Sequence, residues 1–370
     1  MSKITAGIII IGDEILYGRT QDTNSNFMAK ELVRAGIQLN EIRVIDDNCK
    51  NIMKTAMIIG YSGQDGSYLF DLLKDKGYMV IGIGRTTVES NSVLALEAVD
   101  ILSSCQMRKM VRQYPVDEIY YLAAHQHSAE MGTPDDYELF SESFDVHVNG
   151  LLNLLESVKE TGNKTSVFYA GSSHIYGDVS ECPQSESTPQ KPDSIYGISK
   201  QTGMHLMRYY RETYGMFCSS GILFNHESPR RSPQFLLQKI ATSAVAIKHR
   251  KQSQLFLGDL SAKCDWGFAG DYVEAMWRIL QLEYPSDFVI GSGSLHTVQE
   301  FVEIVFASLD LDWRKYVVER PVLFKKKQQQ TPLLGDNTKL RLATGWKPRI
   351  HFEELARLMT ESAFEKKTNE

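Results

Sequence analysis

Two side chains of the segment YGISK, Tyr196 and Lys200, have the types and the spacing needed for proton transfer coupled to redox chemistry. Residues four apart on a helix project from the same face, so both side chains can reach one site. A lysine ammonium beside a phenol favours the phenolate, which lowers the tyrosine pKa from its usual value of about 10. Tyr196 could then take the proton of a sugar hydroxyl while a hydride leaves the same carbon for a nicotinamide. The alternative is that Tyr196 merely caps a loop.

The segment YAGSSHIYGD, residues 169–178, adds polar groups to this chemistry. Ser172 or Ser173 could hydrogen-bond the same substrate oxygen as Tyr196. His174 can accept a proton at neutral pH, because the ordinary histidine pKa is near 6.5. It could instead only hydrogen-bond the substrate or a neighbouring side chain.

Three glycines, Gly60, Gly63 and Gly66, form the pattern G-x-x-G-x-x-G between an apolar strand-like segment and a helix-like one. Glycines let the backbone approach a pyrophosphate, and the start of a helix supplies free N–H groups and the positive end of its dipole. The pattern predicts a dinucleotide site, which also includes Gln64 and Asp65 between the glycines.

The end of the second strand of this unit selects the cofactor. Sites specific for NAD usually carry Asp or Glu there for the ribose 2′-hydroxyl, whereas this chain has Gly84, Arg85 and Thr86. Arg85 could pair with a 2′-phosphate, so NADP is favoured over NAD; the alternative is that Arg85 is a solvated surface residue. Further cofactor contacts are expected from an acid that can contact the adenine and from two small residues beside the cofactor: Asp100, Ala123 and Ala124.

The elements that carry these residues alternate between strand-like and helix-like segments from residue 53 on. Such alternation predicts a doubly wound parallel α/β sheet of the Rossmann type. A separate strand–helix–strand unit precedes it, within residues 5–48, and ends its helix at Gly36. A βαβ fragment of this size buries too little surface to be stable alone, so we expect it to pack on the main domain or on another subunit.

Composition excludes several classes of protein. The 370 residues include 42% hydrophobic and 23% charged residues, which is ordinary for a soluble globular protein. A net charge of −6 argues against a nucleic-acid binder, which needs a basic surface. Five cysteines without a CxxC pair argue against a disulfide framework or a zinc site and fit the reducing cytoplasm. No leader-like segment and no membrane-spanning segment is found, so a cytoplasmic protein is predicted.

Residues 53–363 resemble GDP-mannose 4,6-dehydratase, a family of extended short-chain dehydrogenases/reductases, in the segments GYSGQDGSYL, DEIYYLAA, YGISK, GILFNHESPRRSP, DWGFAGDYVEAMW and TVQEFVEI. The resemblance implies a Rossmann domain with a smaller C-terminal substrate-binding domain, bound NADP, and a homodimer or homotetramer. It also implies a nucleotide diphospho-sugar substrate that is oxidised at C4, loses water across C5–C6 and regains hydride at C6. In the family a threonine and a glutamate assist these steps, and this chain has Ser172 and His174 at their positions.

Other departures concern the substrate nucleotide. The family motif Lys-Arg-Asp-Trp reads Lys-Cys-Asp-Trp here, with Cys264 replacing the arginine, and Leu323 replaces a glutamate. The resemblance leaves these candidates for the diphosphate and the nucleotide: Asn225, Arg230, Arg231, Lys239 and Arg320. His125 and His127 are expected near the sugar or in ordinary polar packing.

Three functions remain open at this point. The first is an NADP-dependent nucleotide-sugar 4,6-dehydratase in which Tyr196 and Lys200 oxidise C4, Ser172 orients the substrate and His174 is the base. The second is a nucleotide-sugar epimerase or C4 oxidoreductase without elimination, suggested by the missing glutamate. The third is a non-catalytic nucleotide-binding scaffold, suggested by the altered base and the lost substrate contacts.

The first unit has a resemblance of its own. The segments GDEIL, GRTQDTN and LVRAGI resemble the opening of the molybdopterin-binding domain of competence-damage-inducible and molybdenum-cofactor biosynthesis proteins. We therefore predict an N-terminal βαβ fragment over residues 1–50 and an extended dehydrogenase domain over 53–370, with its substrate subdomain built mainly from 225–260 and 290–370.

Overall fold

The computed structural model describes residues 5–11, 15, 21–45, 54–85, 94–95, 98–126, 135–320 and 331–368. The chain divides into two compact units, Met1–Lys54 and Thr55–Glu370. His127 and the residue at position 323 lie outside the described residues.

The first unit is a βαβ element, as predicted. Strand β1 (Thr5–Ile11) pairs in parallel with β2 (Gln38–Ile45), and helix α2 (Asn24–Arg34) connects them. The chain leaves the helix through Gly36, whose φ of +74° belongs to the left-handed region that glycine adopts without strain. This confirms Gly36 as the residue that ends the helix.

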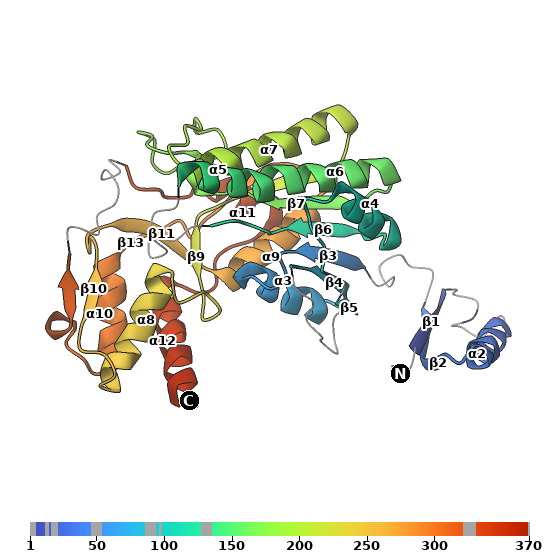
Figure 1. The fold of residues 1–370 in the computed structure, drawn as a ribbon, viewed down its shortest axis with the longest axis horizontal. Coiled ribbons are helices and arrows are strands. Elements are labelled where there is room, and N and C mark those ends of the chain that lie inside the picture. Colours follow the sequence, from blue (N-terminus) through green and yellow to red (C-terminus); the bar gives the residue numbers. More distant parts are fainter. Residues whose placement is uncertain are drawn as a thin grey trace. The chain divides into compact units, whose positions relative to one another are not determined.

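The second unit is built on a seven-stranded sheet in the order β12-β8-β7-β6-β3-β4-β5, in which all neighbouring strands are parallel (Figure 1). Strand β3 lies where the strand order reverses, and ligands of such sheets bind at the carboxyl ends of the strands around this point. The strands are β3 (Thr55–Ile59), β4 (Met79–Ile83), β5 (Leu94–Ala95), β6 (Glu118–Tyr121), β7 (Ser166–Ala170), β8 (Cys218–Leu223) and β12 (Asp287–Ile290).

Helices cover both faces of this sheet, which confirms the predicted doubly wound α/β fold (Figure 1). Alternate strand residues point to opposite faces: Met57 and Ile59 pack with the helices of one face, and Ala56 and Ile58 with those of the other. The first face is covered by α4 (Ser104–Gln113), α6 (Gly150–Thr161) and α7 (Ile195–Tyr214), and the second by α3 (Gln64–Asp75) and α9 (Ala269–Leu280).

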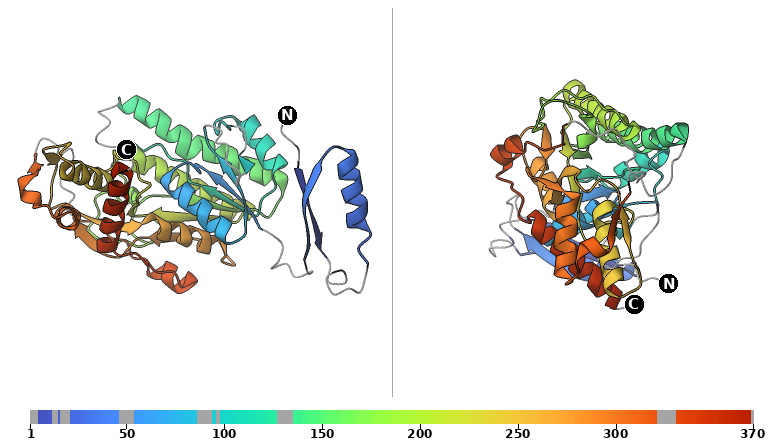
Figure 2. Two further views of the ribbon diagram at one scale, coloured as in Figure 1. Left: turned by 90° about the horizontal axis from the view of Figure 1, so that it is seen from below. Right: turned by 90° about the vertical axis from the view of Figure 1, so that its left-hand side faces the viewer.

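A third hydrophobic core lies at one end of this unit, which faces the viewer in the right-hand view of Figure 2. Its helices contact one another, and short strands complete it. The helices are α8 (Leu236–Lys248), α10 (Val298–Ser308) and α12 (Phe352–Thr368). The strands are β9 (Asn225–Glu227), β10 (Leu255–Leu257), β11 (Lys263–Phe268), β13 (Leu295–Thr297) and β14 (Val317–Glu319); the short α11 (Thr338–Thr344) packs beside α9 and β12.

Two remaining features bear on the protein's class. Cys105, Cys182, Cys218 and Cys264 occur as free thiols. Over the described residues, the helices are too short or too polar for any of them to cross a membrane.

Candidate active site

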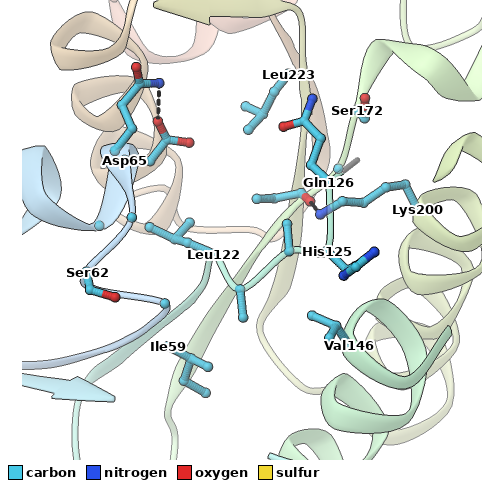
Figure 3. Close-up of a pocket in the computed structure, with 18 of the residues that line it drawn as sticks. Ile59, Ser62, Asp65, Leu122, His125, Gln126, Val146, Ser172, Lys200 and Leu223 are labelled. Carbon is cyan, nitrogen blue, oxygen red and sulfur yellow. Dashed lines mark hydrogen bonds between the residues drawn. The ribbon is translucent and has the colours of Figure 1, made fainter. Parts of the chain in front are cut away.

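A cavity of about 560 Å³ opens at the carboxyl ends of the central strands of the second unit. Figure 3 shows Ser62 and Asp65 on one side of it and Ser172 and Lys200 on the other. It therefore joins the predicted dinucleotide site to the predicted redox pair. These predicted residues line it: Gly60, Gly63, Gln64, Asp65, Gly66, Arg85, Asp100, Ala123, Ala124, Ser172, His174, Tyr196, Lys200, Asn225 and Arg231.

The glycine loop between β3 and α3 is shaped by two close approaches. Gly60 has a φ of +92°, and a Cβ atom there would lie 2.7 Å from the backbone nitrogen of Ala123. A Cβ atom on Gly66 would lie 2.4 Å from the carbonyl oxygen of Gly60. Only glycine fits both positions, and the loop thereby brings the start of α3 against the cavity, with its N–H groups suited to a pyrophosphate.

Tyr196 and Lys200 lie in the first turns of α7, which begins after the N-cap Ser194. The hydroxyl of Ser194 accepts the N–H of Gly197 at 3.2 Å, which fixes the start of the helix. Lys200 is 2% exposed, and its Nζ donates to the carbonyl oxygen of Ala170 at 2.8 Å, at the end of β7. The same Nζ lies 5.7 Å from the centre of the Tyr196 ring, so the phenol and the amine share one corner of the cavity.

The pKa values of this pair are controlled by burial. Burial raises the pKa of Tyr196 to about 12, and the charge of Arg231 and a hydrogen bond with Ser172 offset only part of this effect. Burial also lowers the pKa of Lys200 to about 7. The prediction of a lowered tyrosine pKa is therefore wrong for this structure, because desolvation outweighs the charge of Arg231 and the hydrogen bond with Ser172.

Two imidazole rings flank the phenol of Tyr196. The ring of His174 lies 5.6 Å from it at 88°, and the ring of His147 lies 5.3 Å from it at 86°. His174 lines the cavity, as the strand-end motif predicted. His147 is fully buried and was not predicted from the sequence, because a histidine in an apolar helical segment is ordinarily a core residue.

Asp65 and His226 form an ion pair on the coenzyme side of the cavity. Nε2 of His226 lies 3.0 Å from Asp65 Oδ2, and Nδ1 lies 2.8 Å from the carbonyl oxygen of Phe224. Both partners only accept, so both ring nitrogens carry protons. Burial acts to lower the pKa of His226, but Asp65 raises it above its usual value. Burial acts to raise the pKa of Asp65, but His226 holds it below its usual value.

Glu227 and Arg231 form a second pair, with Arg231 Nε 3.5 Å from Glu227 Oε2. Arg231 also donates to Gln126 Oε1 at 3.4 Å. This hydrogen bond connects the segment after β9 with the segment after β6. Burial raises the pKa of Glu227 to about 7, although the charges of Arg231 and His226 act to lower it. His226 and Glu227 were missed from the sequence, but their place directly after Asn225, behind a buried strand, could have indicated them.

Four predicted substrate residues lie outside the lining of the cavity: Ser173, Arg230, Lys239 and Arg320. Arg230 pairs with Asp71 on α3 at 2.6 Å, and the guanidinium of Arg320 lies 3.6 Å from the centre of the Phe256 ring. Their roles in substrate binding stay predictions.

His125 lines the cavity, and its expected place near the sugar stays a prediction. Its Nε2 lies 3.2 Å from Glu142 Oε2 on α5 (Asp136–Phe144). This contact is the ordinary polar packing that was the alternative for this residue.

Two family models match the chain, one mainly on each unit, and their matches overlap over residues 57–65. The family model "GDP-mannose 4,6 dehydratase" matches residues 57–359, and the model "Probable molybdopterin binding domain" matches residues 7–65. GDP-mannose 4,6 dehydratase 2 of Arabidopsis thaliana is 39% identical over 332 residues, which cover 84% of this chain and 87% of the relative.

Two solved structures have the same fold. RMD from Pseudomonas aeruginosa, complexed with NADPH, has a TM-score of 0.73 at 21% identity and covers 85% of this chain and 100% of its own. The dTDP-glucose 4,6-dehydratase of Bacillus anthracis, in complex with NAD, has a TM-score of 0.71 at 19% identity, with coverages of 85% and 97%. Both bind a pyridine nucleotide in the fold found here.

Proposed function

Because the chain belongs to the GDP-mannose 4,6 dehydratase family, we propose that it is an NADP-dependent nucleotide-sugar 4,6-dehydratase that acts on GDP-mannose or a related GDP-sugar. The observation that carries this proposal is the placement of Tyr196, Lys200 and Ser172 in one cavity with the glycine loop. Residues that could take a proton from a sugar hydroxyl therefore face the space where a dinucleotide fits.

The lining of the cavity fits a pyridine dinucleotide. Gly60 and Gly66 leave room for a pyrophosphate at the start of α3, and Ala123 and Ala124 offer small side chains along its path. Arg85 is exposed at the end of β4 and lines the cavity, where its guanidinium can pair with a 2′-phosphate. This arrangement supports NADP over NAD.

The first step asks Tyr196 to accept the proton of the C4 hydroxyl. When bound, an oxidised nicotinamide coenzyme would supply the hydride acceptor and a positive charge that would favour the phenolate form of Tyr196. Ser172 bonds the phenol and can hold the same sugar oxygen. Lys200, with a pKa of about 7, can take up or release the proton near neutral pH.

Elimination needs a base for the C5 proton, which the C4 ketone acidifies. Among the cavity-lining residues that the structure describes, three carry carboxylates: Asp65, Asp100 and Glu227. Asp65 is paired with His226, Asp100 accepts the N–H of Leu102 at 2.9 Å, and Glu227 is buried against Arg231. His174, beside the phenol, is therefore the group we assign as the base.

The replacement of the family's glutamate by His174 also supports a second candidate, an epimerase or C4 oxidoreductase that keeps the C6 hydroxyl. Here Tyr196 and Lys200 would act as above, and no proton would be removed from C5. Nuclear magnetic resonance of the product separates the two, because only the dehydratase product lacks the C6 hydroxyl.

The test is a mass-spectrometric screen of GDP-mannose and other nucleotide sugars with the purified protein and NADP. We expect one product that has lost one water. Tyr196→Phe should abolish it, which also excludes a non-catalytic scaffold. His174→Ala should remove the product and His174→Glu should retain or restore it. Absence of any dehydrated product across the panel would overturn the proposal.

A further inference from the structure

His147 occupies an unusual place in the fold. It lies in the π-helical turn Asp145–Asn149, between α5 and α6, and is fully buried. Such turns lose regular backbone hydrogen bonds and are frequent at functional sites. Here two tyrosine hydroxyls from the sheet compensate: Tyr121 donates to the carbonyl oxygen of Val146 at 2.6 Å, and Tyr169 to that of His147 at 3.3 Å. The turn is thus anchored on β6 and β7, and its Val146 lines the cavity.

The hydrogen bonds of His147 define its protonation state. The backbone N–H of His125 donates to Nε2 at 3.0 Å, so this nitrogen carries no proton. The proton is therefore on Nδ1, which lies 2.8 Å from the hydroxyl of Ser199. That hydroxyl in turn donates to the carbonyl oxygen of Tyr196 at 2.9 Å. The ring is a neutral imidazole with a single tautomer.

The surroundings of the ring favour this neutral state. Burial lowers the pKa of His147, and the charges of Lys200 and His125 act in the same direction. Among the described residues, the hydroxyl of Tyr169 bonds the carbonyl oxygen of His147 and the ring of Tyr196 lies 5.3 Å from the imidazole; in the coenzyme-free protein both phenols are neutral and do not retain an imidazolium. Its donor and acceptor roles are thus constant where an ordinary histidine titrates.

These contacts connect two parts of the predicted reaction site. His125 directly follows Ala123 and Ala124, which line the cavity where the coenzyme is proposed to bind. Ser199 lies between Tyr196 and Lys200 on α7. One imidazole therefore holds the backbone of the coenzyme-side segment, the first turns of the catalytic helix and, by ring contact at 5.3 Å, the phenol itself.

We propose that His147 is a positioning residue that, as a neutral imidazole, ties the segment after β6 to α7 and so fixes Tyr196 relative to the bound coenzyme. The proposal rests on the function proposed above for Tyr196. His147 exchanges no proton with the substrate. It acts through the His125 backbone on one side and through Ser199 on the other.

We call the contacts of His147 with the His125 backbone and with Ser199 the tether, with a coenzyme side at His125 and an α7 side at Ser199. Three variants separate these two sides. In His147→Asn the amide nitrogen can replace Nδ1 and retain the bond to Ser199, but the N–H of His125 loses its acceptor. In His147→Gln the longer amide can accept from His125, and the bond to Ser199 is lost. Ser199→Ala removes only the link to α7. Thr202→Ala is the matched control, because its hydroxyl also bonds a carbonyl of α7, that of Ile198 at 2.9 Å.

Binding of NADPH, followed by its fluorescence, tests the coenzyme side without requiring turnover. We expect His147→Asn to weaken binding about three- to tenfold, the range of one lost hydrogen bond, while Ser199→Ala and Thr202→Ala bind like the wild type. Once a nucleotide sugar that the protein dehydrates is known, its turnover tests the α7 side. Ser199→Ala and His147→Gln should each lower kcat about three- to tenfold, leave KM unchanged and shift the pH profile of kcat. A purely structural role would lower the active fraction without shifting that profile.

The protonation state is tested by nuclear magnetic resonance of the protein labelled with ¹⁵N-histidine, with His147→Asn used for assignment. The His147 signals should show a neutral ring protonated at Nδ1 from about pH 5 to 8. A ring that titrates in this window, or NADPH binding by His147→Asn equal to that of the wild type, overturns the proposal. If the predicted binding and tautomer are found without any dehydration of nucleotide sugars, the tether stands and the proposed function fails.

Discussion

The ion pair between Asp65 and His226 offers a sharp test of the electrostatics of the site. The side chains are 19% and 12% exposed, and the shortest distance between them is 3.0 Å. An exposed pair contributes up to about 1 kcal/mol, and breaking a fully buried pair costs about 3–5 kcal/mol. For this mostly buried pair we expect Asp65→Asn to cost about 2 kcal/mol, which lowers Tm by about 3 °C.

The pH dependence of this cost has a definite sign. The pKa of His226 is raised above its usual 6.5, so its contribution to stability is complete below that pH and is lost as the pH rises through the higher value in the folded protein. The pKa of Asp65 is lowered from 3.8, so its contribution is present above that pH and is lost as the pH falls through the lower folded value. The variant should therefore be most destabilised between about pH 4 and 6.5 and less so above.

The assay is thermal unfolding of the coenzyme-free protein, followed by circular dichroism from acidic to alkaline pH at one heating rate. Asp71→Asn is the matched control on the same helix, because Asp71 pairs with Arg230 at 2.6 Å but is 51% exposed. Its loss should cost less than about 1 kcal/mol. A Tm difference for Asp65→Asn that is no larger than that of Asp71→Asn, or that does not change between acidic and alkaline pH, would refute the reasoning.

Three further predictions concern coenzyme binding and the redox pair. Gly66→Ala should weaken NADPH binding by about tenfold or more, measured by fluorescence titration, because its Cβ would lie 2.4 Å from the Gly60 oxygen; Gly63→Ala, whose Cβ would lie 3.3 Å from the same oxygen, should have a smaller effect. Arg85→Ala should weaken NADPH binding about tenfold and leave NADH binding unchanged in parallel titrations, since only NADPH carries the 2′-phosphate; equal losses for both coenzymes would contradict this role. Lys200→Met should abolish turnover yet raise Tm at neutral pH by about 2–6 °C. The reason is that burial disfavours the charged amine and lowers the pKa of Lys200 from 10.5 to about 7, and methionine carries no charge to bury. A lower Tm would contradict that interpretation.

The local patterns of the sequence predicted much of this site. The spacing of Gly60, Gly63 and Gly66 and the pair Tyr196 and Lys200 depend on one turn and one helix, so short segments were enough to indicate them. Because the carboxyl ends of parallel strands meet at one edge of the sheet, the fold class alone brings these segments to one cavity.

Properties that depend on burial and on distant neighbours could not be predicted in this way. The predicted direction of the shift in the Tyr196 pKa was wrong, because the shift is set by desolvation, which no single segment of the sequence reveals. The role of His147 requires the π-helical turn and contacts with His125 and Ser199, which lie far apart in the chain. The ion pair of Arg230 with Asp71 likewise joins residues far apart in the chain, and the role of Arg230 in substrate binding stays a prediction.

The most direct test of the central claim follows the hydrogen that leaves the sugar. The claim is that Tyr196 removes the C4 hydroxyl proton while the C4 hydrogen passes to the coenzyme in the same cavity. GDP-mannose carrying deuterium at C4 should yield a product that has lost one water and carries the deuterium at C6, and Tyr196→Phe should yield none. A product that keeps its C6 hydroxyl, or equal conversion by Tyr196→Phe, would contradict the account.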